Sequence, residues 1–243
     1  MTNVAIITGA SRGIGAATAR LLAVNGYAVC VNYNSSATQA NALVDEINKL
    51  GGKAIAIKAD MAKEQEIIAM FNQVDNELGE VNALVNNAGI NGGIRAVEEI
   101  DAECLESVFA TNVFGIFYSC REAIKRMKKI GNGGIVNISS EAAKFGGNKL
   151  AHYAASKAAI NTFTIGFARE VAGYNIRVNT ISPGVIDTEV HLTSPPDRLQ
   201  MLKDSLPMKR MGSSDEVAQS VLWLLSDKAS YVSGSIIPVA GGR

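Results

Sequence analysis

Short runs of apolar, often β-branched residues alternate with longer segments of helical periodicity along the chain, and this alternation restricts the possible folds more than any other feature. In the longer segments apolar residues recur three and four positions apart, as in an amphipathic helix. The predicted strands cover residues 4–8, 28–32, 54–58, 83–86, 134–139, 176–181 and 235–239. The predicted helices cover residues 14–25, 37–50, 64–78, 103–130, 153–172 and 214–226. Strands that alternate with helices in this way form a parallel sheet with helices on both faces.

No linker, charge block or low-complexity stretch divides the 243 residues, so we expect a single domain over residues 1–243. One segment, 189–212, differs in composition because it carries Pro195-Pro196, Pro207 and several methionines. Segments of this length without a regular pattern are usually functional. We expect residues 189–212 to form a mobile lid over a substrate, with apolar surface from Met201, Leu206 and Met208.

The charge balance excludes several classes of partner. With 23 basic and 23 acidic side chains the formal net charge is zero, which gives no long-range attraction for nucleic acid or an anionic membrane. No apolar run approaches the roughly 20 residues of a membrane span, and no signal peptide is recognisable. Three widely spaced cysteines, Cys30, Cys104 and Cys120, resemble neither a disulfide framework nor a zinc site. We therefore expect a cytoplasmic protein, with Cys30 as a small core residue.

Two other kinds of chemistry are not expected. His191 has no carboxylate or second histidine at ligand spacing, so no metal site is expected. Ser140 does not lie in the Gly-x-Ser-x-Gly motif of many hydrolases, so it is not expected to be a hydrolase nucleophile.

A glycine-rich sequence connects the first predicted strand to the first predicted helix: Thr8-Gly9-Ala10-Ser11-Arg12-Gly13-Ile14-Gly15. Glycines allow a tight turn and a close approach to a pyrophosphate, and the free N–H groups at the helix start bind the anion. An isolated motif of this kind is as often an ordinary turn, but its position between a strand and a helix favours dinucleotide binding. The predicted fold is α/β, with a single Rossmann-type doubly wound parallel sheet of about seven strands and helices on both faces.

Tyr153 and Lys157 are four residues apart in a predicted helix, which places their side chains on the same face. A tyrosine has an ordinary pKa of about 10, and a nearby ammonium lowers that pKa, so the pair can exchange a proton with an alcohol or a carbonyl oxygen. Ser140 follows a strand at the edge where parallel sheets bind ligands, and its hydroxyl can hold the same oxygen. Alternatively, Tyr153 and Lys157 are an ordinary pair on an amphipathic helix without a catalytic role. The presence of the glycine loop and of Ser140 in the same chain favours a catalytic site.

In this order and spacing, the motifs resemble those of the short-chain dehydrogenase/reductase superfamily, and the resemblance covers essentially the whole chain. Residues 8–15 have the superfamily spacing T-G-x-x-x-G-x-G. The other motifs that carry the resemblance are Asp60, Asn86-Asn87-Ala88-Gly89, Asn112, Ser140, Tyr153-Ala154-Ala155-Ser156-Lys157 and Pro183-Gly184. The resemblance implies an oxidoreductase that transfers a hydride between a nicotinamide cofactor and a carbonyl or secondary alcohol.

The resemblance also implies a role for each residue of a catalytic group. Tyr153 would be the acid/base, Ser140 would orient the substrate, and Lys157 would bind the nicotinamide ribose and tune Tyr153. Asn112 would help to hold a water-linked proton path near the lysine. Ser139 competes for the serine role, but the superfamily places its catalytic serine thirteen residues before the tyrosine, which selects Ser140.

The cofactor is expected to be NADP(H), with NAD(H) as the open alternative. Enzymes selective for NAD usually carry an acidic side chain after the second strand, whereas residues 31–35 contain no carboxylate. Arg12 can pair with a 2′-phosphate, as an arginine at this position does in related reductases. No second basic residue stands at Asn34 or Ser35, two positions expected to border the cofactor. The resemblance places Asp60 and Met61 at the adenine and residues 183–188 at the nicotinamide. The full set of expected cofactor contacts adds Gly9, Ser11, Gly13, Ile14, Gly15, Asn87, Ala88, Gly89, Tyr153, Lys157, Pro183, Gly184, Ile186 and Thr188.

Substrate recognition is expected from residues 141–150 and 189–212, neither of which carries a decisive signature. The chain is similar to bacterial reductases of the glucose/ribitol dehydrogenase-like group, which implies a small polyol, sugar or ketone as substrate. The 3-oxoacyl-(acyl-carrier-protein) reductases are near relatives, so that activity is the first alternative. A non-catalytic NADP-binding regulatory protein is an alternative of another class, against which the intact Ser140, Tyr153 and Lys157 argue.

Partner surfaces are less well defined. Five basic residues at the end of the helix 103–130 can bind an acidic carrier protein, or can form a solvated helix end favoured by the helix dipole. These residues are Arg121, Lys125, Arg126, Lys128 and Lys129. The resemblance implies a homotetramer through the helices 103–130 and 153–172, whose apolar residues include Phe109, Val113, Phe117, Phe163 and Phe167. His152, next to Tyr153, is expected at the substrate pocket or at the surface, on another face of its helix.

Overall fold

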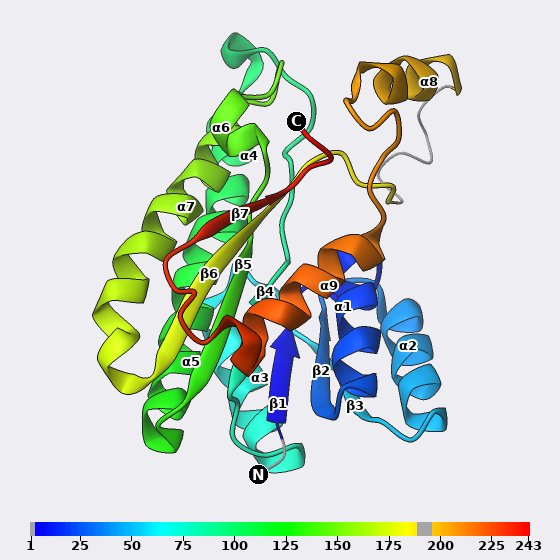
Figure 1. The fold of residues 1–243 in the computed structure, drawn as a ribbon. Helices are drawn as coiled ribbons and strands as arrows, with labels where there is room; N and C mark the ends of the chain where they lie inside the picture. Colours follow the sequence, from blue (N-terminus) through cyan, green and yellow to red (C-terminus); the bar gives the residue numbers. More distant parts are fainter. Residues whose placement is uncertain (1–2, 189–195) are drawn as a thin grey trace.

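One seven-stranded parallel sheet forms the centre of the computed structural model, which describes residues 3–188 and 196–243 (Figure 1). The strands are β1 Asn3–Ile7, β2 Tyr27–Tyr33, β3 Lys53–Lys58, β4 Ala83–Asn86, β5 Gly133–Ile138, β6 Ile176–Pro183 and β7 Ile236–Val239. Their order is β3-β2-β1-β4-β5-β6-β7, and every neighbouring pair is parallel. The chain thus builds outward from β1 to β3 and then returns to place β4 beside β1. In a doubly wound sheet, ligands bind at this reversal, outside the carboxyl ends of the strands.

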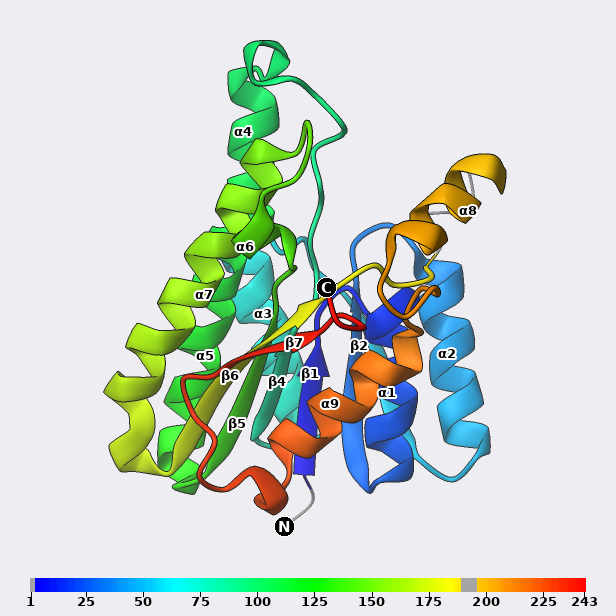
Figure 2. The same ribbon diagram turned by 45° about the horizontal axis from the view of Figure 1, so that its top comes forward.

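Helices cover both faces of the sheet, as predicted (Figures 1 and 2). The helices are α1 Gly13–Val24, α2 Ala37–Lys49, α3 Glu64–Glu77, α4 Ala102–Phe109, α5 Gly115–Ile130, α6 Ala142–Phe145, α7 Ala151–Val171, α8 Pro196–Ser205 and α9 Ser214–Leu225. Short 3₁₀ turns cover Val97–Glu99, Ala172–Tyr174 and Asp227–Ala229. Buried residues of α1, α2 and α9 form a core on one face, and those of α3, α5 and α7 form a core on the other. The sheet is therefore buried on both sides, which explains why its strands are continuously apolar.

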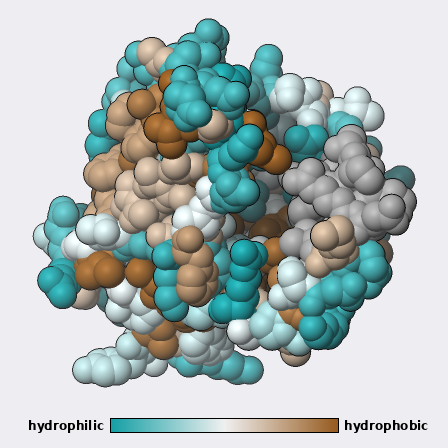
Figure 3. All heavy atoms as spheres, turned by 90° about the horizontal axis from the view of Figure 1, so that it is seen from above, coloured by the Kyte–Doolittle hydropathy of each residue, from teal (hydrophilic) through white to brown (hydrophobic). Residues whose placement is uncertain are grey.

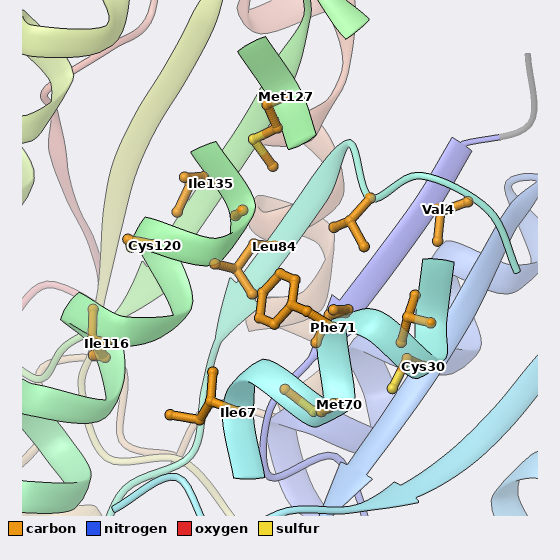
Figure 4. Close-up of a cluster of buried hydrophobic side chains, with 14 of the residues drawn as sticks. Val4, Cys30, Ile67, Met70, Phe71, Leu84, Ile116, Cys120, Met127 and Ile135 are labelled. Carbon is orange, nitrogen blue, oxygen red and sulfur yellow. The ribbon is translucent and has the colours of Figure 1, made fainter. Parts of the chain in front are cut away.

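Figure 4 shows the core between the sheet and the helices α3 and α5. Phe71 of α3, Leu84 of β4 and Cys120 of α5 each expose 1% or less of their surface. Cys30 of β2 belongs to the same cluster and is fully buried, as predicted. Burying a side chain such as Phe71 or Leu84 stabilises the fold by roughly 2–3 kcal/mol, so this layer fixes the strands whose ends form the site.

The long helix predicted over residues 103–130 is interrupted, so the prediction of one continuous helix is wrong. A π-helical turn, Ala110–Phe114, lies between α4 and α5. Gly115 follows it, and a Cβ there would overlap the carbonyl of Met61 in the segment after β3. Single π turns inside helices are frequent at functional sites, and this one contains Asn112.

The segment 189–212, expected as a mobile lid, is partly a regular helix. Residues 189–195 lie outside the described residues, but α8 covers Pro196–Ser205, with its proline at the first helical position, where no N–H is needed. Leu206, expected to supply exposed apolar surface, is buried, whereas Met201 and Met208 are exposed. Figure 2 shows α8 standing apart from the sheet, on the side of its carboxyl ends.

Candidate active site

A cleft with a volume of about 800 Å³ opens at the carboxyl ends of the strands. Figure 3 looks onto this side of the molecule, where hydrophilic and hydrophobic residues lie side by side. Every predicted cofactor-binding residue lines the cleft except Gly15, and every predicted catalytic residue lines it except Asn112. Motifs that are far apart in the sequence thus meet in one cleft, because parallel strands end at the same edge of the sheet.

The glycine loop owes its shape to close contacts with the segment after β4. Gly9 has a φ of +60°, and a Cβ there would lie 2.8 Å from the Cα of Ala88. A Cβ on Gly15 would lie 2.6 Å from the amide nitrogen of Asn87 and 2.6 Å from the carbonyl of Gly9. Gly15 is therefore required by packing, which explains why it does not line the cleft. Only glycine fits at both positions.

Hydrogen bonds hold this loop from two sides. The side-chain amide of Asn87 donates to the carbonyls of Thr8 at 3.0 Å and Gly9 at 2.9 Å. The side-chain oxygen of Asn32, at the end of β2, accepts from the N–H of Gly9 at 3.0 Å. Arg12, the N-cap residue of α1, makes no side-chain cap hydrogen bond to the first turn. The first residues of α1, Gly13 and Ile14, line the cleft without a side-chain cap on their turn, an arrangement that fits a pyrophosphate.

The residues after β2 suit the ribose end of a nucleotide. Asn34 and Ser35 are exposed and line the cleft, and no carboxylate lies at this position. Arg12 is exposed and lines the cleft as well. Asp60 and Met61 follow β3 and complete this side, where the Asp60 carboxylate accepts a hydrogen bond from the N–H of Ala62 at 2.9 Å. A Cβ on Gly13 would lie 3.6 Å from Thr188, so the segment after β6 faces the glycine loop across the cleft.

Tyr153 projects from the first turn of α7 toward the end of β5. Burial raises the pKa of the Tyr153 phenol, and hydrogen bonding with the Ser140 side chain opposes that rise. Ser140 accepts a hydrogen bond from the N–H of Ala142 at 3.1 Å, which fixes its hydroxyl at the start of α6. Ser139 is engaged elsewhere, since its hydroxyl donates to the carbonyl of Lys157 at 3.1 Å. Of the two serines, Ser140 is the one that acts on the tyrosine.

Lys157 lies one helical turn after Tyr153, with its ammonium nitrogen 5.8 Å from the centre of the phenol ring. The side chain is buried, and burial lowers its pKa to about 8. Its ammonium donates a hydrogen bond to the carbonyl of Ile138 at 2.8 Å. We expected the lysine to lower the pKa of Tyr153, but in this arrangement the net direction is upward, because desolvation is the largest effect on the phenol.

Asn112 is fully buried beneath the segment after β4. Its side-chain oxygen accepts from the N–H of Ile90 at 2.9 Å, and its amide donates to the carbonyl of Ile90 at 2.8 Å and to Ser156 at 3.0 Å. A Cβ on Gly89 would lie 3.2 Å from the Asn112 oxygen and 3.3 Å from the Lys157 nitrogen. Asn112 thus lies beside Lys157 behind Gly89 without lining the cleft itself, and it holds the backbone of Ile90 in place.

His152 does not lie where we expected it. It is 4% exposed and belongs neither to the surface nor to the lining of the cleft. It packs under Gly92, where a Cβ would lie 2.7 Å from its Nε2. Neither ring nitrogen has a hydrogen-bond partner among the described residues. The helical position before Tyr153 points into the space between α4 and α7, which the pattern of α7 alone does not reveal.

Glu141 and Arg243 are among the residues of the cleft that were not singled out from the sequence. Glu141 follows Ser140 and is 6% exposed, and Arg243 lines the mouth from the end of the chain. Glu141 could have been identified as a cleft residue from the sequence, because it directly follows a candidate catalytic residue and belongs to the loop expected to recognise substrate. No sequence signal pointed to Arg243, whose position depends on the course of β7.

The structure also bears on two other classes of protein. Within residues 3–188 and 196–243, no group of three or more histidine, cysteine, aspartate or glutamate side chains is placed to hold a metal ion. None of the helices in the described part of the chain has the length and apolar character needed to cross a membrane.

Known proteins similar to this chain match it over nearly its whole length. A family model described as enoyl-(acyl carrier protein) reductase matches residues 9–243. An uncharacterized oxidoreductase of Escherichia coli, YgfF, is 49% identical, over 99% of each chain. The 3-oxoacyl-[acyl-carrier-protein] reductase FabG of Staphylococcus epidermidis is 37% identical, over 100% of this chain and 99% of its own. An uncharacterized oxidoreductase of Methylorubrum extorquens is 38% identical, over 98% of this chain and 96% of its own.

Proposed function

Because the chain belongs to the short-chain dehydrogenase/reductase superfamily, we propose that it interconverts a carbonyl compound and a secondary alcohol by hydride transfer, with NADP(H) as its cofactor. The observation that carries the proposal is the meeting of the glycine loop, Ser140, Tyr153 and Lys157 in one cleft. A dinucleotide-binding loop and a buried proton donor beside a hydroxyl are what such a reaction requires at one place.

The residues divide the chemistry between them. A bound nicotinamide supplies or accepts the hydride. Ser140 holds the oxygen of the substrate by a hydrogen bond, while Tyr153 donates a proton to that oxygen in reduction or takes one from it in oxidation. Lys157 bonds the ribose and, when charged, stabilises the phenolate of Tyr153. Asn112 keeps the segment above Lys157 in place and borders the path by which the proton is replaced.

The preference for NADP(H) rests on Arg12 and on the residues after β2. Arg12 lines the cleft and can pair with a 2′-phosphate, and Asn34 and Ser35 present no carboxylate that would repel it. An NAD-selective site would carry an acidic side chain there. NAD(H) is the second candidate, because one arginine is the only basic residue in the glycine loop.

For the substrate we propose a small polyol, sugar or ketone, as in the glucose/ribitol dehydrogenase-like group. The alternative, a 3-oxoacyl-(acyl-carrier-protein) reductase, is supported by the name of the Staphylococcus relative. The basic end of α5 gives it little support, because Arg121 pairs with Glu64, Lys125 with Glu122 at 2.7 Å, and Arg126 with Asp75 at 2.8 Å. Only Lys128 and Lys129 of the five basic residues form no such ion pair within the described residues, which leaves little net charge for an acidic partner.

The remaining proposals concern the domain organisation, the cellular location and the oligomeric state of the protein. Residues 1–243 act as one nucleotide-binding domain, with residues 189–212 as the part that closes over substrate, and the protein works in the cytoplasm. A homotetramer is supported by three exposed apolar side chains: Phe114 in the π turn, Phe117 in α5 and Ile165 in α7. Phe109 and Phe163 are only partly buried in the core, whereas Val113 is 7% exposed and offers no surface.

The proposed function is tested by following NADPH oxidation against a panel of ketones, aldoses and β-ketoacyl thioesters. Turnover of a ketone or aldose is expected, at a higher kcat/KM with NADPH than with NADH. Preferred turnover of the thioesters would support the carrier-protein alternative. Tight NADPH binding without turnover of any panel member would instead support a regulatory protein.

A further inference from the structure

The end of β5 and the first half of α7 are joined by a series of side-chain hydrogen bonds. The side-chain amide of Asn137 donates to the hydroxyl of Thr164 at 2.9 Å, and the hydroxyl of Ser139 donates to the carbonyl of Lys157 at 3.1 Å. The partners in α7 thus come earlier in the chain as the strand proceeds, so the helix runs opposite to the strand. The bond from Ser139 is the one nearer the start of α7, where Tyr153 lies.

The hydroxyl of Ser139 starts from a fixed place in the sheet. The residue exposes 4% of its surface, and its N–H donates to the carbonyl of Ile181 in β6 at 2.8 Å. A serine hydroxyl is separated from the backbone by a single rotatable bond, so it has few positions open to it. Ser139 therefore connects the backbone of α7 to the sheet through a short and stiff link.

The other bond between Lys157 and β5 constrains the helix backbone less. The ammonium of Lys157 donates to the carbonyl of Ile138, but a flexible four-carbon stem separates that ammonium from the backbone of α7. The carbonyl of Lys157 lies inside α7, where the N–H four residues later bonds to it, so it needs no second donor. The hydroxyl of Ser139 thus serves to join the two elements rather than to satisfy an unpaired carbonyl.

The position of α7 matters because Tyr153 has to meet Ser140, the residue that directly follows Ser139. A misplacement of reacting groups by about 1 Å can slow a reaction by about a hundredfold. We infer that Ser139 is a positioning residue for the proton transfer, whose hydroxyl holds the backbone of α7 so that Tyr153 and Ser140 reach the same substrate oxygen. The inference rests on the proposed function and adds to it a residue that acts through Tyr153.

Ser139→Ala removes this hydroxyl and tests the inference. The kcat for the best carbonyl substrate should fall by about tenfold or more, while NADPH binding by fluorescence stays within about threefold of the wild type. Ser119→Ala is the matched control, because Ser119 is also buried and its hydroxyl donates to a helix carbonyl, that of Gly115 in α5, outside the cleft. The control should lose a similar amount of thermal stability and keep its kcat within about twofold.

A pH profile separates positioning from a general loss of structure. Hydrogen bonding with Ser140 opposes the raised pKa of Tyr153, so moving these two side chains apart should raise that pKa further. In Ser139→Ala the alkaline rise of kcat/KM for alcohol oxidation should therefore move to higher pH. A smaller folded fraction would lower the rate at every pH and leave the profile in place. Ser139→Thr keeps the hydroxyl and should keep the wild-type profile.

Three results would overturn the inference: a kcat of Ser139→Ala within about twofold of the wild type, an equal loss of kcat in Ser119→Ala, or an unchanged pH profile. A profile displaced as far in Ser139→Thr as in Ser139→Ala would also do so, because the hydroxyl would then have no part in it. These results leave the proposed function standing. A wild type that turns over no member of the substrate panel would overturn both.

Discussion

The ammonium nitrogen of Lys157 donates a hydrogen bond to the carbonyl oxygen of Ile138 at 2.8 Å, which anchors the charge of α7 to the last residue of β5. The same nitrogen lies within 3.3 Å of the place where a Cβ on Gly89 would stand. Burial lowers the pKa of Lys157 to about 8, so the protein holds a cation at the floor of the cleft against a desolvation cost. The buried ammonium of Lys157 suits the proposed proton transfer by Tyr153, but its desolvation lowers the free energy of unfolding.

Replacing Lys157 by methionine should stabilise the protein at pH 7 while it abolishes turnover. The lowering of the Lys157 pKa from 10.5 to about 8 corresponds to a cost of about 3 kcal/mol for the charged side chain in the folded protein. The methionine variant removes this cost but leaves the Ile138 carbonyl without its hydrogen-bond donor, which destabilises the variant by about 1–3 kcal/mol. The expected net gain is therefore up to about 2 kcal/mol in the free energy of unfolding. Urea unfolding without cofactor measures it.

The pH dependence of that gain has a fixed sign. Below the folded pKa of about 8, both the folded and the unfolded wild type hold the proton, and the full cost is present. Between about pH 8 and 10.5 the unfolded chain binds the proton that the folded chain has released, so wild-type stability rises relative to the variant. A stability difference that stayed constant from pH 7 to pH 10 would show that Lys157 is not desolvated as described.

The raised pKa of Tyr153 predicts opposite pH profiles for the two directions of the reaction. Reduction needs the protonated phenol, which is present at neutral pH, so its kcat/KM should stay level there and fall only under alkaline conditions. Oxidation needs the phenolate, so its kcat/KM should rise with pH in the alkaline range. Initial rates in both directions test this expectation, and an oxidation optimum at or below pH 7 would be incompatible with it.

Gly15→Ala should damage both folding and cofactor binding, although Gly15 does not line the cleft. The added Cβ would lie 2.6 Å from the Asn87 amide and 2.8 Å from the Cα of Ala10, and backbone atoms cannot move aside cheaply. Overpacking of this kind costs roughly 1–3 kcal/mol. Gly173→Ala, where the new Cβ meets nothing within 4 Å, is the control. Equal NADPH affinity in the two variants would contradict the packing role of Gly15.

Arg12→Ala should raise the KM for NADP at least tenfold and leave the KM for NAD little changed, because the arginine is proposed to bind only the 2′-phosphate. Lys63→Ala provides the control, since Lys63 pairs with Glu66 at 3.0 Å and does not line the cleft. Equal effects of Arg12→Ala on both cofactors would contradict the NADP assignment.

Periodicity predicted the sheet well because it reports on local burial. The runs that form β1 to β6 contribute buried residues to the core, whereas β7 at the edge of the sheet is only partly buried. The turn after each strand carries a residue that lines the cleft. Gly9, Asp60, Asn87 and Ser140 could be placed together from the sequence for this reason alone: all four follow parallel strands.

Features that depend on contacts between distant segments could not be read from local patterns. The π turn at Asn112 is accompanied by hydrogen bonds to the backbone of Ile90, which lies 22 residues earlier. His152 packs against Gly92, and the backbone of Glu141 is held by hydrogen bonds with Pro183 and with the turn of α6. A heptad or strand pattern contains no information on such pairings.

In the proposed reaction Tyr153 passes the proton while the other residues of the cleft bind the cofactor, and Tyr153→Phe separates these two roles. The variant keeps the ring and loses only the hydroxyl, so NADPH binding by fluorescence should remain within about threefold of the wild type, whereas kcat for the best carbonyl substrate should fall by about a hundredfold or more. Turnover that persisted at more than a tenth of the wild-type rate, with binding intact, would contradict the account.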